Sequence, residues 1–226
     1  MKNTAEMWRR QPMYTFQEAA ILAGVAQQTV RNWFLGRKSR GAVEVSPLFP
    51  DGIGRNSMIS FVQLIETVIA AQFRNADRVP YSIVHSAYRY ARSTLGVEYP
   101  FAHIKLEALG VHIIARRGDE QGGESLQAFD LPPQWTIPGL VVKVIHQIDY
   151  EEDLAARWFP VGKDNPIVID PKVSSGLPTI VGRGVTIQTI CKRKAAGQDI
   201  DFIARDLALK SEVVETVLQY GDRFAA

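Results

Sequence analysis

Residues 14–35 read YTFQEAAILAGVAQQTVRNWFL, and this stretch predicts two short helices joined at a glycine. Thr15 and Glu18 have the spacing of a capping box, in which each side chain accepts a hydrogen bond from the other residue's backbone N–H. Apolar residues then recur at three- and four-residue spacing, and Gly24 can take the positive φ that a sharp turn needs. A second helix is expected over roughly Gln27 to Leu35. Its buried stripe is Val30, Trp33 and Phe34.

The other side of this second helix is polar. It carries Gln27, Gln28, Arg31 and Asn32, at positions i, i+1, i+4 and i+5. Arginine makes paired hydrogen bonds to guanine, and asparagine or glutamine to adenine, in the major groove of DNA. Basic residues that follow the helix would contact phosphates, which supply affinity but no sequence choice. These residues are Arg37, Lys38 and Arg40. The pattern predicts a DNA recognition helix; an ordinary helical hairpin with a solvated polar face is the alternative.

Two features beside the helices bear on this hypothesis. Ala26 stands where the second helix would take a Ser or Asp cap, and alanine there typically costs about 1 kcal/mol. Further on, Asp51-Gly52-Ile53-Gly54-Arg55 is a turn with extended flanks. It is equally consistent with a β-wing, which would bring Arg55 to the minor groove or the backbone, and with a surface loop.

Composition and charge set the class of protein. The chain has 226 residues, 46% hydrophobic and 22% charged, with a formal net charge of +2, which are ordinary globular proportions. The single cysteine, Cys191, excludes a disulfide scaffold, and no apolar run is long enough to span a bilayer. We therefore expect a soluble cytoplasmic protein. Residues 1–40 hold seven basic residues against two acidic ones, whereas residues 41–160 hold ten against fourteen, so the N-terminal end is positive.

The C-terminal part predicts a second helical unit. Three helices are expected after short strand-like pieces: one over Thr186 to Ala196, one capped by Asp199 and one capped by Ser211. The last helix would expose Glu212 and Glu215, which a phosphate-lined groove would repel. This unit is therefore better explained as a dimerisation or partner-docking module than as a second DNA reader.

The expected fold class is mainly α with small β elements (α+β). We expect a DNA-binding region with a winged helix-turn-helix over residues 1–98, a mixed α/β region over 99–164 and a helical domain over 165–226. An apolar run over Leu140 to Ile148 fits a helix or a strand. His85, His103, His112 and His146 are widely spaced, and no catalytic motif is present. We expect a protein that is not an enzyme, with no cofactor and no metal.

Two segments carry a resemblance to known families. The stretches Ile167-Val168-Ile169-Asp170-Pro171, Gly176 to Val185 and Ala196-Gly197 resemble the small prokaryotic DUF433 family, and Thr15–Leu35 is similar to a MerR-like helix-turn-helix. Their order resembles the longer VapB-type antitoxins. The resemblance implies a PIN-like ribonuclease toxin as partner, repression of the protein's own operon, and a homodimer on operator DNA. The alternative is a stand-alone transcription regulator without a toxin, and a neighbouring PIN-like reading frame would distinguish the two.

Overall fold

The structure of the protein is a computed structural model, which describes residues 7–37, 45–50, 53, 58–76, 79–106, 139–221 and 224. The fold class is α+β, as expected. In chain order, the elements before the long gap are α1 (Met7–Arg10), β1 (Pro12–Thr15), α2 (Phe16–Ala23), α3 (Gln27–Leu35), β2 (Met58–Ser60), α4 (Phe61–Ala76), α5 (Tyr81–Leu95) and the 3-10 turn η3 (Pro100–Ala102). After it come α7 (Gly139–His146), β3 (Ile148–Glu151), β4 (Leu154–Trp158), β5 (Ile167–Val168), η4 (Ser174–Gly176), β6 (Thr179–Ile180), α8 (Ile187–Ala195), α9 (Ile200–Asp206) and α10 (Ser211–Gly221).

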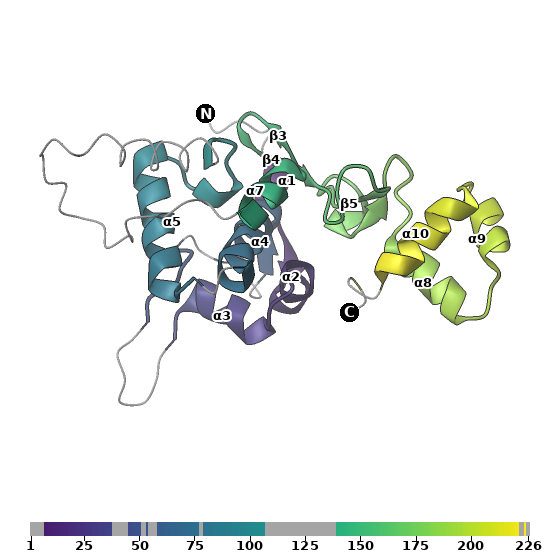
Figure 1. The fold of residues 1–226 in the computed structure, drawn as a ribbon, viewed down its shortest axis with the longest axis horizontal. Coiled ribbons are helices and arrows are strands. Elements are labelled where there is room, and N and C mark those ends of the chain that lie inside the picture. The colour runs from purple at the N-terminus through teal and green to yellow at the C-terminus, as the bar shows by residue number, and fades with distance from the viewer. Residues whose placement is uncertain are drawn as a thin grey trace, which may run out of the picture.

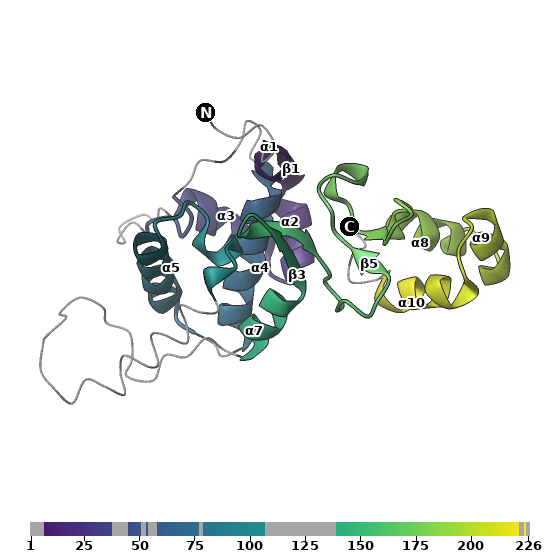
Figure 2. The ribbon, with the colours of Figure 1, turned by 90° about the horizontal axis from the view of Figure 1, so that it is seen from above.

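Helix α4 is the centre of the larger hydrophobic core. It contacts α1, α2, α5, α7 and η3, and every residue from 61 to 71 is buried. Figures 1 and 2 show α5 on one side of α4 and α2 on the other. The polar residues Gln63, Glu66 and Thr67 are therefore buried as well, and each forms a hydrogen bond within the fold.

Three short antiparallel ribbons complete the described part of the fold. β1 pairs with β2, with Tyr14 opposite Ile59, and so ties the start of α2 to the start of α4. β3 and β4 form a hairpin after α7. The ambiguous run at 140–148 is therefore a helix up to His146, and a strand begins at Ile148.

The C-terminal unit has a hydrophobic core of its own. Its members are Ile167, Ile180, Ile187, Ile190, Ile203, Ala204, Val214 and Val217. The three expected helices are present, and Asp199 stands at the N-cap of α9, although its side chain makes no capping bond. The expected cap at Ser211 is wrong: the N–H groups of Val213 and Val214 donate to the carbonyl of Lys210, so Ser211 already lies in the first turn of α10. Its hydroxyl donates to Asp201 Oδ1 at 2.6 Å.

The region expected at 99–164 shares the larger core. Tyr99, Phe101 and Leu106 pack into the same cluster as α2 to α5, as do Val141 and Trp158. The division into three domains at residues 98 and 164 stays a prediction. Within the described ranges, no helix is both long and apolar enough to cross a membrane.

The C-terminal unit lies beside α2, on the side away from α5 (Figures 1 and 2). The turn η4 reaches the other unit, where the Tyr14 hydroxyl donates to the carbonyl of Gly176 at 2.9 Å. Burial raises the pKa of Tyr14 well above its usual range, so the hydroxyl stays protonated and remains a donor. Lys172 stacks on the Trp8 ring, 4.2 Å from its centroid, and pairs with Glu151. These contacts hold residues 170–178 against the N-terminal unit.

Candidate DNA-binding surface

The first helix of the pair begins as the sequence predicts. The backbone N–H of Thr15 donates to Glu18 Oε2 at 2.7 Å, and the N–H of Glu18 donates to Thr15 Oγ1 at 3.2 Å, which completes the capping box. The helix ends at Gly24, whose φ of 67° is left-handed. The backbone there turns sharply, and α3 starts three residues later.

Helix α3 is fixed from its inner side by aromatic packing. Phe34 stacks on Phe16 with ring centroids 5.7 Å apart and contacts Phe49 at 4.9 Å, while Trp33 meets Phe49 edge to face. The N–H of Phe49 also donates to the carbonyl of Trp33 at 3.0 Å. Residues 45–50 thus form a brace behind α3, which we call the 45–50 segment. Sequence reasoning missed this role, although Leu48-Phe49 between two prolines was a signal that these residues are buried.

The outer side of α3 presents the predicted polar residues. Gln27, Gln28 and Arg31 are exposed and Asn32 is half-buried. Gln28 Nε2 donates to Asn32 Oδ1 at 2.8 Å, so these two amides are held together one turn apart. Each amide keeps hydrogen-bonding capacity for a base edge, since an amide has two donor hydrogens and two acceptor lone pairs. The arrangement brings one guanidinium and three amides to one helix face.

Backbone pairing begins directly after α3. Arg37 and Val45 exchange both backbone hydrogen bonds, at 2.9 and 3.0 Å, in an isolated antiparallel bridge. The sequence did not predict this bridge, and the turn at 51–55, for which a wing and a surface loop were both left open, lies outside the described residues except for Ile53. Arg37 is exposed at the end of α3. Lys38, Arg40 and Arg55 lie outside the described residues, so their predicted phosphate contacts stay predictions.

The positive charge of the N-terminal end is smaller at this surface than the sequence suggested. Arg9 is only 2% exposed and pairs with Glu151 at 3.1 Å, and Arg10 pairs with Glu98. Both arginines form ion pairs within the fold, so their charges are neutralised by carboxylates there. The described cations at α3 are therefore Arg31 and Arg37.

Comparison with known proteins agrees with this geometry. Residues 12–87 match the family described as "Putative DNA-binding HTH domain", and residues 167–221 match the family described as "Protein of unknown function (DUF433)". The chain is a DNA-binding helix-turn-helix protein with a DUF433 domain. It is 25% identical over 229 residues to the uncharacterized protein Rv2308 of Mycobacterium tuberculosis, a match that covers 94% of this chain and 91% of that protein.

The fold as a whole also has a solved counterpart. The crystal structure of Rv2018 from Mycobacterium tuberculosis has a TM-score of 0.69 to this chain at 21% identity, over 92% of this chain and 97% of that one. At this identity the likeness shows the fold alone. The same fold thus occurs over nearly the whole length of a second protein.

The start of the recognition helix offers a stability test within the helix-turn-helix domain. Ala26 has extended backbone angles suited to a cap but forms no side-chain capping bond. We expect Ala26→Ser to raise the free energy of unfolding by about 1 kcal/mol, because the hydroxyl would satisfy a free N–H group of α3. Urea unfolding measures this change in the free energy of unfolding. Thr15→Ala, which removes the cap of α2, is the matched control and should lower stability by a similar amount; a loss in both variants would contradict the capping account.

Proposed function

We propose that this protein is a DNA-binding antitoxin that represses its own operon and holds a PIN-like ribonuclease toxin inactive. The observation that carries the DNA-binding half is the exposed polar face of α3, formed by Gln27, Gln28, Arg31 and Asn32. On this proposal α3 lies in the major groove, with these four side chains at base edges. Arg37 and the basic residues after it contact phosphates.

The toxin-binding half rests on the resemblance to VapB-type antitoxins and on charge. A helix-turn-helix segment and a DUF433 segment follow one another here, in the order that the resemblance to those antitoxins implies. In the DUF433 domain, α10 exposes Glu212 and Glu215. Since a phosphate-lined groove repels carboxylates, this helix suits a protein partner better than DNA. On this proposal the protein is a homodimer, is not an enzyme and needs no cofactor.

The DNA half is tested by the salt dependence of operator binding. We expect the affinity of the full chain for its upstream DNA to fall steeply with salt, because each phosphate contact releases counterions. Arg37→Ala should reduce the slope of log K against log salt by about 1 and weaken binding to all sequences about equally. Gel shifts or fluorescence anisotropy at several salt concentrations measure both effects. If Arg37→Ala leaves the slope unchanged, Arg37 does not contact a phosphate.

The toxin half is tested by co-expression with the neighbouring reading frame. If the neighbour encodes a PIN-like nuclease, the two proteins should co-purify, and the antitoxin should suppress its ribonuclease activity. If operator binding is found but no nuclease partner exists, the protein is the stand-alone regulator instead.

A further inference from the structure

A small cavity of about 250 Å³ lies between the helix-turn-helix and the C-terminal unit. One wall is built from β1 and α2, and the other from residues 175–178, the start of α8 and a residue near the C-terminus. The apolar side chains of the two walls include Met13, Ile21, Leu22, Leu177, Pro178 and Phe224. A ligand bound in this cavity would contact both units at once.

Hydrogen bonds hold the walls of the cavity in place. The bond from the Tyr14 hydroxyl to the carbonyl of Gly176, 2.9 Å long, joins one wall to the other. The side chain of Met13 approaches the same glycine, since a Cβ there would lie 2.8 Å from the Met13 sulfur. The N–H of Ile187 donates to the carbonyl of Pro178 at 2.9 Å, which ties residues 175–178 to the start of α8. The cavity is therefore formed before a ligand binds, which lowers the ordering cost of binding.

Apolar side chains around the cavity are left partly uncovered. Leu177 is 40% exposed, and Met13, Ile21, Leu22 and Phe224 are half-buried. A molecule seated among them would remove this apolar surface from water, which favours binding. The Met13 thioether and the Phe224 ring suit an aromatic ligand in particular, because sulfur atoms and ring edges make favourable contacts with aromatic rings.

The volume of the cavity limits the size of the ligand. An apolar cavity of about 150 Å³ is large enough to bind benzene. At about 250 Å³, this cavity has room for one aromatic ring with a short side chain.

Glu18 supplies the charge at this site. Among the described residues that line the cavity, it alone has a charged side chain, and it forms no ion pair within the described ranges. Both hydrogen bonds from Thr15 go to Glu18 Oε2, so Oε1 keeps acceptor capacity for another donor. Burial, and then the charges of Glu18 and Asp170, raise the pKa of Tyr14, so the electrostatic field at this wall is negative.

We propose that this cavity binds a small aromatic amine, with its ring among Met13, Leu177 and Phe224 and its ammonium group on Glu18. An ammonium group has three donor hydrogens, and the Ser175 hydroxyl and the Gln188 amide in the lining are further acceptors. The cavity is separate from the exposed residues of α3, so the inference is independent of the operator and of the toxin. It gives the protein a ligand in addition to DNA.

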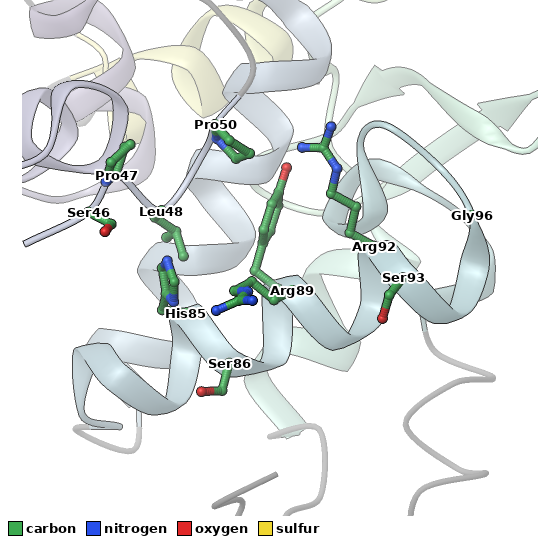
Figure 3. A pocket seen from close by; sticks show the side chains of 11 residues that line it. Ser46, Pro47, Leu48, Pro50, His85, Ser86, Arg89, Arg92, Ser93 and Gly96 are labelled. Carbon is green, nitrogen blue, oxygen red and sulfur yellow. The ribbon is translucent and has the colours of Figure 1, made fainter. Parts of the chain in front are cut away.

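A larger groove provides a comparison within the same molecule. It has a volume of about 950 Å³ and lies between α5 and the 45–50 segment (Figure 3). Arg89 and Arg92 line it, and none of its described lining residues is acidic, so it does not suit an ammonium group. A preference for an amine therefore distinguishes the cavity at Glu18 from this groove.

Calorimetric titration of the full chain with 2-phenylethylamine tests the proposal. The neutral 2-phenylethanol and the anionic 3-phenylpropionate keep the ring and a short chain, and we expect the amine to bind most tightly and the acid most weakly. Glu18→Gln should weaken amine binding by about 10-fold, the loss typical of one charged hydrogen-bonding partner, and should abolish the preference over the alcohol. Glutamine also serves in a capping box, so α2 should stay capped. The matched control is Glu152→Gln, which removes an exposed carboxylate between β3 and β4 and should leave the affinity unchanged.

NMR of the methionine methyl groups locates the ligand in the unaltered protein. The chain has four methionines, of which Met13 lines the cavity and Met7 is 58% exposed elsewhere. The ring of bound 2-phenylethylamine should shift the methyl signal of Met13 and leave that of Met7 unchanged. Met13→Leu identifies the signal.

Three outcomes would overturn the proposal. One is the absence of saturable binding of 2-phenylethylamine. The second is an affinity for the amine that equals the affinity for the alcohol or is unchanged by Glu18→Gln, because Glu18 would then not hold the ammonium group. The third is binding that leaves the Met13 signal unshifted, because the ligand would then lie outside this cavity.

Discussion

Replacing Arg31 with alanine should weaken operator binding by about 1–3 kcal/mol, roughly 5- to 150-fold, and relax base choice at one position. The guanidinium is exposed on α3, and the aromatic packing behind the helix does not involve it. The substitution should therefore remove the proposed contact with DNA and leave the fold intact. Fluorescence anisotropy against the operator and against a set of single-base variants measures both effects.

The control for Arg31 removes the same charge elsewhere. Arg183→Ala takes one exposed arginine from the DUF433 domain and should change operator affinity little. Equal affinity of Arg31→Ala and the wild type would show that α3 does not read bases. Equal losses of affinity in both variants would show that Arg31 contributes only through the net charge of the protein.

Replacing Gly176 with alanine should lower the free energy of unfolding by about 2–5 kcal/mol. Gly176 has a φ of 74°, and a Cβ there would overlap the Tyr14 hydroxyl and lie 2.8 Å from the Met13 sulfur. The left-handed backbone costs a residue with a side chain about 1–2 kcal/mol, and the overlap adds about 1–3 kcal/mol. Urea unfolding followed by circular dichroism measures the loss.

Gly182 provides the matched control, because its backbone is also left-handed but no side chain lies close to it. Its φ is 70°, and a Cβ would meet nothing within 4 Å. Gly182→Ala should therefore show only the backbone cost of about 1–2 kcal/mol. If the two alanine variants lose the same stability, the close approach of Tyr14 to Gly176 does not contribute. Tyr14→Phe, which removes the hydrogen bond alone, should cost about 1 kcal/mol.

The helix-turn-helix could be predicted because its signals are local. The capping box of Thr15 and Glu18, the turn at Gly24 and the uncapped Ala26 all lie within a few residues of the backbone they affect. The bounds of α3 could be predicted from the same short stretch of sequence. The polar face could be named for the same reason, since residues three and four apart share a helix face.

The failures came from partners far away in the chain. The charge count at the N-terminus gave no sign that Arg9 pairs with Glu151, 142 residues later. Ser211 has the residue type of a cap, but α10 begins one residue earlier than such a cap requires, and the serine hydroxyl donates to Asp201 on α9. Nor does a sequence window show that Phe49 packs behind Trp33 and Phe34.

The sequence by itself determined the two helices of the helix-turn-helix, the polar residues on α3 and the helical DUF433 unit, because hydrogen-bonding side chains and helical periodicity act over one or two turns. Only the tertiary structure decided where the Tyr14 hydroxyl bonds, that Arg9 and Arg10 pair with distant carboxylates, and that Phe49 packs behind α3. Those arrangements depend on side chains that meet only after the core has closed around α4. Their energy comes from burial and pairing across the fold, which no local pattern encodes.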